Sequence, residues 1–428
     1  MAKEKKISSI LKEVVKRIEP SNEELNYINL YLKNFIDKLN KKISSLKINA
    51  EIFVGGSFAK KTLIKKNKYD IDLFLRFDKM HKKENISELT KKILKDFSNV
   101  SVIHGSRDYF RIATEENFFI ELIPVIKVNN SKDAENITDL SYSHVKYINK
   151  KINSQKLKQE VMIAKEFCYA CNVYGAESYI KGFSGYSIEL LIVKYKSFMN
   201  MIKNLSKADD KLIIDIEKYY KNKNELMMNI NSSKLNSPII LIDPTFKQRN
   251  ALAGLSQETF NRFKEHCKEF LKSPSIEYFE MKKTDLEKVR LDAKKKKFEF
   301  ILLEAKTNKQ EGDIAGSKLL KFYNHIYGEI SRYFEMKNKG FNYNGKKSAR
   351  YFFVCKNREN LIYEGPSTKD EKSSKEFKKE HKNVFEKKGR FYAREKINFN
   401  LKEFIEKWKK KNTKQINEMK IEEVKIIN

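Results

Sequence analysis

The pattern of apolar and polar residues predicts that the chain begins with two amphipathic helices. In residues 4 to 19, lysines alternate with apolar side chains at helical spacing, and Pro20 ends this first helix. Ser21 and Glu24 have the spacing of a capping box, in which each side chain bonds the backbone N–H of the other residue. A second helix is therefore expected there, with apolar positions from Leu25 to Leu46.

Alternating apolar residues next predict a small mixed sheet backed by these helices. In Tyr69 to Phe77, every second residue from Ile71 onwards is apolar, which places Asp70 and Asp72 together on the opposite face of a strand. Other apolar runs predict strands at Ile52 to Val54, Val100 to His104, Tyr109 to Thr114 and Phe118 to Ile126, with a helix over Asn85 to Phe97.

Beyond this sheet, the pattern changes twice. From Asp139 to about Ser273 it is largely helical, with a glycine-rich interruption near the middle. From Val289 the chain is rich in lysine and strand-like, with a strand expected within Lys294 to Ala305. The lysine-laden segment from Lys369 to Lys382 is expected to be a mobile loop. The sequence therefore predicts an α+β protein, and its 428 residues suffice for two to four domains.

Charge indicates the class of partner. The formal net charge is +31, from 88 Lys and Arg against 57 Asp and Glu, which favours binding to a polyanion such as nucleic acid. No apolar run approaches the roughly 18 residues of a membrane span, and the start lacks a signal-like apolar segment, so a cytoplasmic protein is expected. Cys168 and Cys171 lie in an apolar helical pattern, so we expect a buried helix face there.

The candidate chemistry lies in Val54 to Phe77. Gly55 and Gly56 allow a tight turn and a close approach of the backbone to a ligand, and Ser57 stands where a helix could begin. Together with Lys60 and Lys61, this turn suits a polyphosphate. A Gly-Gly-Ser turn alone is usually only a turn, and it is the conjunction with the carboxylate strand that indicates a site.

The carboxylates indicate metal chemistry. Asp70 and Asp72 lie two residues apart on one strand face, about 6.6 Å along it. Convergent carboxylates at such spacing can hold two Mg²⁺ ions about 3.5–4 Å apart. Glu121 is the one charge in the apolar run FFIELIPVI, where burial is costly unless a cation or donor meets it. Glu121 is therefore the candidate third carboxylate.

A GS turn, a D-x-D strand and a carboxylate on a later strand resemble the DNA polymerase β nucleotidyltransferase superfamily. Within it, the chain most resembles the archaeal-type (class I) CCA-adding enzymes, the tRNA nucleotidyltransferases. The likeness covers nearly the whole chain and weakens after about residue 280. Four further blocks fall in the family's order: DLSYSHVKYI (Asp139 to Ile148), NVYGAESYIKGFSGYSIELLIVKY (Asn172 to Tyr195), IDPTFKQRNALAGLS (Ile242 to Ser256) and PSIEYF (Pro274 to Phe279).

The resemblance implies a polymerase β-like palm in residues 1–137, a helical nucleotide-binding neck in 138–278 and an α+β RNA-binding body and tail in 279–428. It implies that Asp70 and Asp72 bind both Mg²⁺ ions and that Glu121 binds the ion that activates the attacking 3′-hydroxyl. The nucleotide-binding positions that it implies are Gly56, Ser57, Lys60, Ser141, His144, Lys165, Tyr174 and Arg249, with Arg249 reading the base edge.

Three positions depart from the family's usual pattern. Lys60 stands where an arginine is usual, which keeps the charge and loses the bidentate geometry on a phosphate. Leu140 replaces an arginine, and Glu121 replaces an aspartate. None of the three removes a required chemical group.

The resemblance therefore implies an enzyme that adds CCA to the 3′ end of tRNA from CTP and ATP, possible as a homodimer. The runner-up is a poly(A) polymerase or oligoadenylate-type enzyme that uses ATP alone. A catalytically inactive RNA-binding protein is a third reading. A small-substrate adenylyltransferase is disfavoured because it would have no use for the basic C-terminal half.

Overall fold

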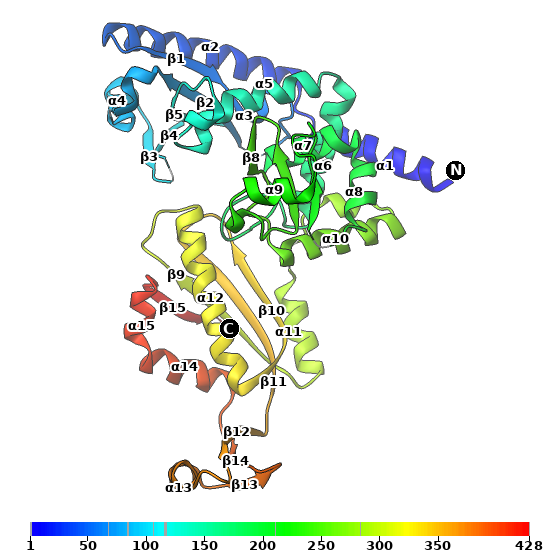
Figure 1. Cartoon of the computed structure of the whole chain (residues 1–428), viewed down its shortest axis with the longest axis vertical. Helices are drawn as coiled ribbons and strands as arrows, with labels where there is room; N and C mark the ends of the chain where they lie inside the picture. The colour runs from blue at the N-terminus through cyan, green and yellow to red at the C-terminus, as the bar shows by residue number, and fades with distance from the viewer. Residues whose placement is uncertain are drawn as a thin grey trace. The chain divides into compact units, whose positions relative to one another are not determined.

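The computed structural model describes residues 2–66, 68–83, 85–105, 107–114, 118–209, 211–282 and 284–427 (Figure 1). It contains two compact units, Met1–Lys282 and Lys283–Asn428. The division into palm, neck and body stays a prediction. No helix in these described ranges is long and apolar enough to cross a membrane.

Two helices open the first unit, as the sequence predicts. Helix α1 spans Ala2–Ile18 and helix α2 spans Asn22–Ser45. The predicted capping box is present: Glu24 N–H donates to Ser21 Oγ over 3.1 Å, and Ser21 N–H donates to Glu24 Oε2 over 2.8 Å. The buried stripe of α2, at three- and four-residue spacing, packs on the sheet of the first unit and consists of Ile28, Leu32, Phe35, Leu39 and Ile43.

The palm sheet has the strand order β1-β2-β5-β4-β3. Its strands are β1 (Ala50–Val54), β2 (Tyr69–Phe77), β3 (Val100–Ile103), β4 (Tyr109–Ala113) and β5 (Phe118–Ile126), so the predicted strands are confirmed. The expected helix at 85–97 is the shorter α4 (Ile86–Ile93). Strands β2 and β5 pair in parallel, with Asp72 opposite Glu121, and the other neighbours pair antiparallel.

A helical layer follows in the same unit and contains the largest apolar core. Its main helices are α5 (Ser141–Lys151), α6 (Gln155–Ala170), α7 (Gly185–Tyr195), α8 (Phe198–Leu205) and α10 (Gln257–Lys272). Cys168 and Cys171 are both buried in this core, as predicted. The sequence did not predict the small sheet of β6 (Leu212–Ile214), β7 (Ile239–Asp243) and β8 (Phe246–Asn250), because short apolar runs fit a buried helix equally well.

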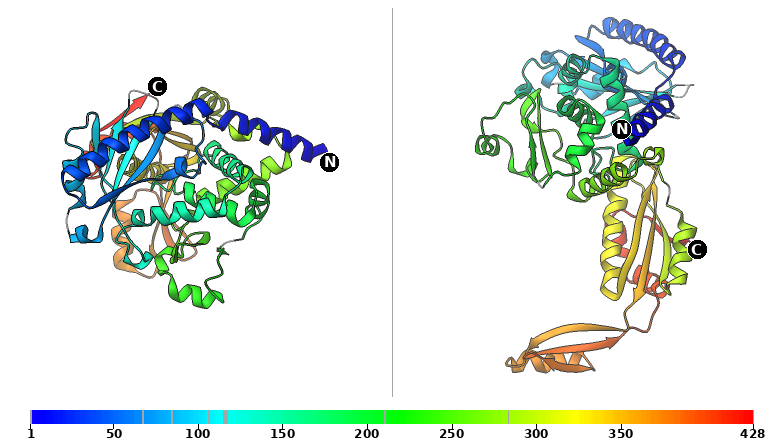
Figure 2. Two further views of the ribbon diagram at one scale, coloured as in Figure 1. Left: turned by 90° about the horizontal axis from the view of Figure 1, so that it is seen from above. Right: turned by 90° about the vertical axis from the view of Figure 1, so that its right-hand side faces the viewer.

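The second unit has a four-stranded antiparallel sheet in the order β10-β11-β9-β15. Its strands are β9 (Glu299–Lys306), β10 (Phe334–Tyr343), β11 (Ser348–Asn357) and β15 (Glu423–Ile427). Helices α12 (Asp313–Tyr333) and α14 (Leu401–Lys411) share the apolar core of this sheet. The yellow ribbon of α12 runs along the sheet in the right-hand view of Figure 2. The predicted strand within Lys294 to Ala305 is thus confirmed.

A smaller sheet in the order β12-β14-β13 completes the second unit. Its strands are β12 (Asn360–Ser367), β13 (Val384–Lys387) and β14 (Arg390–Lys396). The loop expected over residues 369–382 is wrong, because this segment contains helix α13 (Glu371–Glu380). Asp370 caps that helix by accepting from Ser373 N–H over 3.1 Å, and Ser374 is buried against β12. The lysine-rich composition concealed a capped helix in which Ser374 is buried.

Candidate active site

Strand register brings two of the predicted carboxylates together. Asp72 on β2 lies directly opposite Glu121 on β5, and in paired parallel strands such residues point to the same face. Burial, followed by the charges of Glu121 and Asp70, raises the pKa of Asp72 to about 7, although Lys60 and Lys165 oppose the shift. Asp70, two residues earlier, is exposed at the edge of the same cluster. All three carboxylates therefore act on one another electrostatically.

Glu121 also has a cationic neighbour that the sequence reasoning missed. Arg111 on β4 is its cross-strand partner and donates to Glu121 Oε1 from Nη2 over 2.6 Å and from Nε over 3.1 Å. Burial raises the pKa of Glu121, with Arg111 opposing and Asp70 adding to the increase. The Asp72, Glu121 and Arg111 side chains thus form one row across three neighbouring strands.

The glycine turn is shaped around Asp72. Gly56 has a φ of +61°, in the left-handed region that favours glycine, and an added Cβ would lie 1.7 Å from Asp72 Oδ2. Gly55 N–H donates to the carbonyl of Asp72 over 2.8 Å. Ser57 lies in the four-residue helix α3 (Gly56–Ala59), which begins where the sequence predicts. Only glycine at position 56 lets the turn approach the carboxylate so closely.

The donor set fits a divalent cation. As the side chains stand, no group of three or more His, Cys, Asp and Glu residues in the described ranges lies close enough to hold a metal ion. However, burial raises the pKa of the Asp72 carboxyl, and the charges of Glu121 and Asp70 add to the increase, so a bound cation would stabilise the ionised carboxylate. Oxygen donors are also those that Mg²⁺ prefers.

The two predicted phosphate-binding lysines meet at a third residue. Lys60 Nζ donates to Glu189 Oε2 over 2.6 Å, and Lys165 Nζ donates to Glu189 Oε1 over 3.3 Å. Burial lowers the pKa of Lys165 to about 8, and Glu189 opposes that shift. Burial acts to raise the pKa of Glu189, but the two lysines outweigh it and hold that pKa below its ordinary value. The cluster thus combines two cations with one carboxylate.

His144 and Arg249 also converge on a shared carboxylate. Asp243, at the end of β7, accepts from Arg249 Nη1 over 2.7 Å and lies 3.1 Å from His144 Nε2, both at Oδ2. Its other oxygen accepts from the Tyr186 hydroxyl over 2.9 Å. The Tyr186 ring stacks on His144 with centroids 4.1 Å apart. Burial lowers the pKa of His144, although the contact with Asp243 opposes that shift.

Tyr174 lies beside Lys165, and Ser141 lies on the helix that carries His144. Tyr174 stacks on Tyr169 with centroids 3.9 Å apart. A Cβ on Gly185 would lie 2.9 Å from the Tyr174 hydroxyl and 3.8 Å from Lys165 Cε, so Gly185 allows both side chains to approach the start of α7. Ser141 is the first residue of α5, and His144 follows three residues later on the same helix face.

The structure also shows how the chain accommodates Leu140. Leu140 is buried in the place of the family's usual arginine. The neighbouring Asp139 forms an ion pair with Arg107 over 3.1 Å and accepts from the backbone N–H of Ile126 over 3.0 Å. Arg107, from the connection between β3 and β4, therefore supplies a cation beside Asp139.

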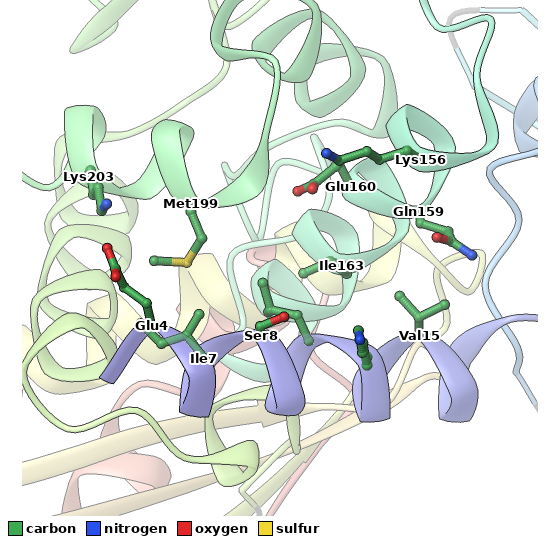
Figure 3. Close-up of a pocket in the computed structure, with 12 residues that line it drawn as sticks. Glu4, Ile7, Ser8, Val15, Lys156, Gln159, Glu160, Ile163, Met199 and Lys203 are labelled. Carbon is green, nitrogen blue, oxygen red and sulfur yellow. The ribbon is translucent and has the colours of Figure 1, made fainter. Parts of the chain in front are cut away.

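A separate cavity of about 530 Å³ lies between α1 and helices α6 and α8 (Figure 3). Ile7, Val15, Ile163 and Met199 contribute to its apolar wall. Its described lining includes none of the predicted site residues, so the candidate site is the carboxylate and lysine region instead.

Comparisons with known proteins identify the family of the chain. The family model described as "Nucleotidyltransferase domain" matches residues 36–168, and the model described as "tRNA nucleotidyltransferase, second domain" matches residues 159–280. A CCA-adding enzyme of Methanocaldococcus jannaschii is 30% identical over 401 residues, which cover 91% of this chain and 86% of that protein. The chain belongs to the CCA-adding enzyme family.

Other members of the CCA-adding enzyme family match over shorter stretches. The Nanoarchaeum equitans enzyme is 42% identical over 212 residues, 49% of this chain, and the match spans about half (52%) of that protein. The Thermococcus gammatolerans enzyme is 30% identical over 279 residues, 64% of this chain and 61% of that protein. Similarity to these relatives is therefore concentrated in part of their length.

The solved structures with a similar fold include the Cid1 poly(U) polymerase. One Cid1 structure has a TM-score of 0.50 and 13% sequence identity, and the match covers 66% of this chain and 99% of Cid1. At this identity the likeness concerns the fold alone, and it confirms the predicted polymerase β-like α+β architecture for this CCA-adding enzyme family member.

Sequence reasoning missed three residues that organise the site: Arg111, Glu189 and Asp243. Glu189 is the one charge in the apolar run SIELLIV, which is the signal that identified Glu121. Asp243 likewise ends the apolar run IILI. A search for isolated charges in apolar runs would have found both.

Proposed function

We propose that the protein adds CCA to the 3′ end of tRNA from CTP and ATP by nucleotidyl transfer, with release of pyrophosphate. The observation that carries this proposal is the register of Asp72 opposite Glu121 beside the Gly56–Ser57 turn. Membership of the CCA-adding enzyme family supports the choice of tRNA, CTP and ATP as substrates. The basic composition is suited to binding the tRNA backbone.

Asp70, Asp72 and Glu121 would hold two Mg²⁺ ions. Such ions, when bound, lower the pKa of an attacking hydroxyl and neutralise charge on the phosphates. Ser57 and Lys60, from the turn and the end of α3, would bind the triphosphate. These groups fix the phosphates beside the carboxylate row, which favours reaction by positioning the reacting atoms.

The helical layer would hold the rest of the nucleotide. His144, Lys165 and Tyr174 lie near the triphosphate and sugar in this proposal, with Ser141 at the start of α5. Arg249 presents a planar fork that Asp243 holds in one orientation, which suits recognition of a base edge.

Two other functions are outcomes of the same test. Incorporation of ATP alone would indicate a poly(A) or oligoadenylate-type enzyme. Binding of RNA without any incorporation would indicate an inactive RNA-binding protein. The intact carboxylate row and lysine cluster favour the active enzyme.

The deciding experiment supplies tRNA that lacks its CCA end, Mg²⁺ and each nucleoside triphosphate singly and in pairs. We expect CMP incorporation from CTP, and AMP incorporation only after CMP. Asp72→Asn is the matched inactive control. A wild-type protein that incorporates no CMP would overturn the proposal. The homodimer and the cytoplasmic location stay predictions, to be tested by light scattering and by fractionation.

A further inference from the structure

Glu189 joins two ammonium groups that come from separate segments of the first unit. Lys60 follows helix α3 beside the palm sheet, Lys165 lies on α6, and Glu189 lies on α7. Their exposed fractions are 8%, 2% and 0%. A buried carboxylate between two nearly buried ammonium groups fixes all three side chains, because each charge would be costly without its partners.

The hydrogen bonds of Lys165 are all directed at the protein. An ammonium group has three N–H donors. Lys165 Nζ lies 2.9 Å from Thr62 Oγ1, 3.1 Å from the carbonyl of Thr62 and 3.3 Å from Glu189 Oε1. Thr62 Oγ1 in turn donates to Glu189 Oε1 over 3.1 Å. All three donors of Lys165 thus have protein acceptors in this structure, which anchors Glu189 and Thr62 to α6.

Lys60 differs from Lys165 in this respect. Within the described residues, its ammonium group forms one hydrogen bond, the 2.6 Å contact with Glu189 Oε2. Two N–H donors remain for another acceptor. Lys60 ends the short helix whose first residue, Gly56, approaches Asp72, and its ammonium reaches Glu189 on α7, so it joins the glycine turn to the helical layer.

We propose that Glu189 is a positioning residue that aims the Lys60 ammonium at the nucleotide triphosphate, with Lys165 as the buried counter-ion that keeps Glu189 in place. This inference rests on the proposed function and deepens it. It adds to the proposed phosphate contacts a carboxylate that sets the orientation of the Lys60 ammonium. It also explains how lysine serves where the family usually has arginine, since the carboxylate supplies the orientation that a planar guanidinium would otherwise supply.

An alternative role for Glu189 is that of a competitor that occupies the lysines until a triphosphate displaces it. Complete burial on α7, with a third hydrogen bond from Thr62, argues against displacement. The two roles predict opposite effects of removing the charge. A competitor, once removed, leaves a tighter nucleotide site, whereas a positioning residue, once removed, leaves a weaker one.

The test compares CMP addition by full-length wild type, Glu189→Gln, Lys60→Met and the double variant. Glu189→Gln places an amide N–H₂ against an ammonium and should raise KM for CTP about tenfold, with kcat within about threefold of wild type. In the Lys60→Met background, Glu189→Gln should change KM less than about twofold, because the effect passes through Lys60. Equal effects in both backgrounds would overturn the proposal.

Two further variants keep the result interpretable. Glu160→Gln removes a carboxylate of α6 that accepts from Phe198 N–H over 2.7 Å and, in the described part of the chain, forms no ion pair with either lysine, and it should leave KM for CTP unchanged. Glu189→Asp keeps the negative charge that pairs with the two buried lysines, so the fold should persist. Its shorter side chain places the carboxylate farther from Lys60, which should raise KM for CTP severalfold. A KM for Glu189→Asp equal to or below that of wild type would refute the inference. Failure of the wild type to add CMP would instead refute the proposed function.

Discussion

Arg249 Nη1 donates to Asp243 Oδ2 over 2.7 Å, and this contact fixes the guanidinium proposed to recognise the base. Asp243 is buried and Arg249 is partly exposed, so the carboxylate acts as a rigid support for a group that remains accessible. His144 and Tyr186 complete the same hydrogen-bonded cluster. The orientation of Arg249 is thus set by residues from two helices and one strand.

Arg249→Ala should lower kcat/KM for CTP and ATP by about 10- to 100-fold, since a hydrogen bond to a charged group contributes about 1.5–3 kcal/mol. It should also reduce the preference for CTP and ATP over UTP, because the remaining site lacks the planar guanidinium. Single-nucleotide incorporation rates measure both effects. Arg262→Ala, on the half-exposed face of α10, is the control and should behave as wild type. An unchanged base preference would show that another group recognises the base.

Asp243→Asn should destabilise the protein by about 3 kcal/mol, because it leaves a cation beside a buried neutral group. Burial acts to raise the pKa of Asp243, but His144 and Arg249 hold that pKa below its ordinary value of 3.8. Asp243 therefore stabilises the fold above about pH 4, and this contribution is lost as pH falls through the lowered pKa. Urea unfolding at pH 7 and pH 3 should show a smaller pH dependence in Asp243→Asn than in wild type.

Asp72→Asn should abolish nucleotide addition, by at least about a thousandfold, because a neutral amide cannot hold divalent cations against their mutual repulsion. The fold should persist, since the substitution removes a carboxylate whose pKa is raised to about 7 by burial and like charges. Chelation of divalent ions should abolish nucleotide addition by the wild type, and added Mg²⁺ should restore it. Comparable activity of Asp72→Asn and wild type would refute the metal assignment.

Glu121→Gln should reduce single-turnover CMP addition about a hundredfold or more, because it removes a charge proposed to hold an ion beside the 3′-hydroxyl. Glu121→Asp should retain partial activity, since it keeps the charge. Glu121 could instead serve only the ion pair with Arg111. In that case Gln can still accept from Arg111, and the substitution should cost little activity. A Gln variant within a few-fold of wild type at saturating Mg²⁺ supports that reading.

Affinity for tRNA should fall linearly with log salt concentration, with a slope of about −0.7 to −0.9 for each phosphate neutralised. Lys375→Ala with Lys379→Ala, on the exposed face of α13, should flatten this slope. Lys12→Ala with Lys16→Ala, exposed on α1, is the matched control and should leave it unchanged. Filter binding over 50 to 300 mM salt, about the range where phosphate contacts dominate, measures both pairs. A nearly salt-independent affinity would exclude the second unit as the tRNA surface.

The sequence by itself determined the first two helices, the strands of the palm sheet and the candidate carboxylates Asp70, Asp72 and Glu121. Alternation in Tyr69 to Phe77 assigned Ile71, Leu73, Leu75 and Phe77 to the core, and all four are fully buried. Such patterns are local, because strand and helix periodicity follow from neighbouring residues. The capping box at Ser21 could be predicted for the same reason, because it depends only on residues three apart.

Only the tertiary structure decided which charges meet. Glu189 lies 129 residues from Lys60, and Asp243 lies 99 residues from His144, so no local pattern links them. Each pairing arises because packing brings α7 to the end of α3 and β7 to α5, and burial then makes each charge depend on its partner. The sequence specified the groups that the chemistry requires, and the fold assigned the carboxylates that hold them in position.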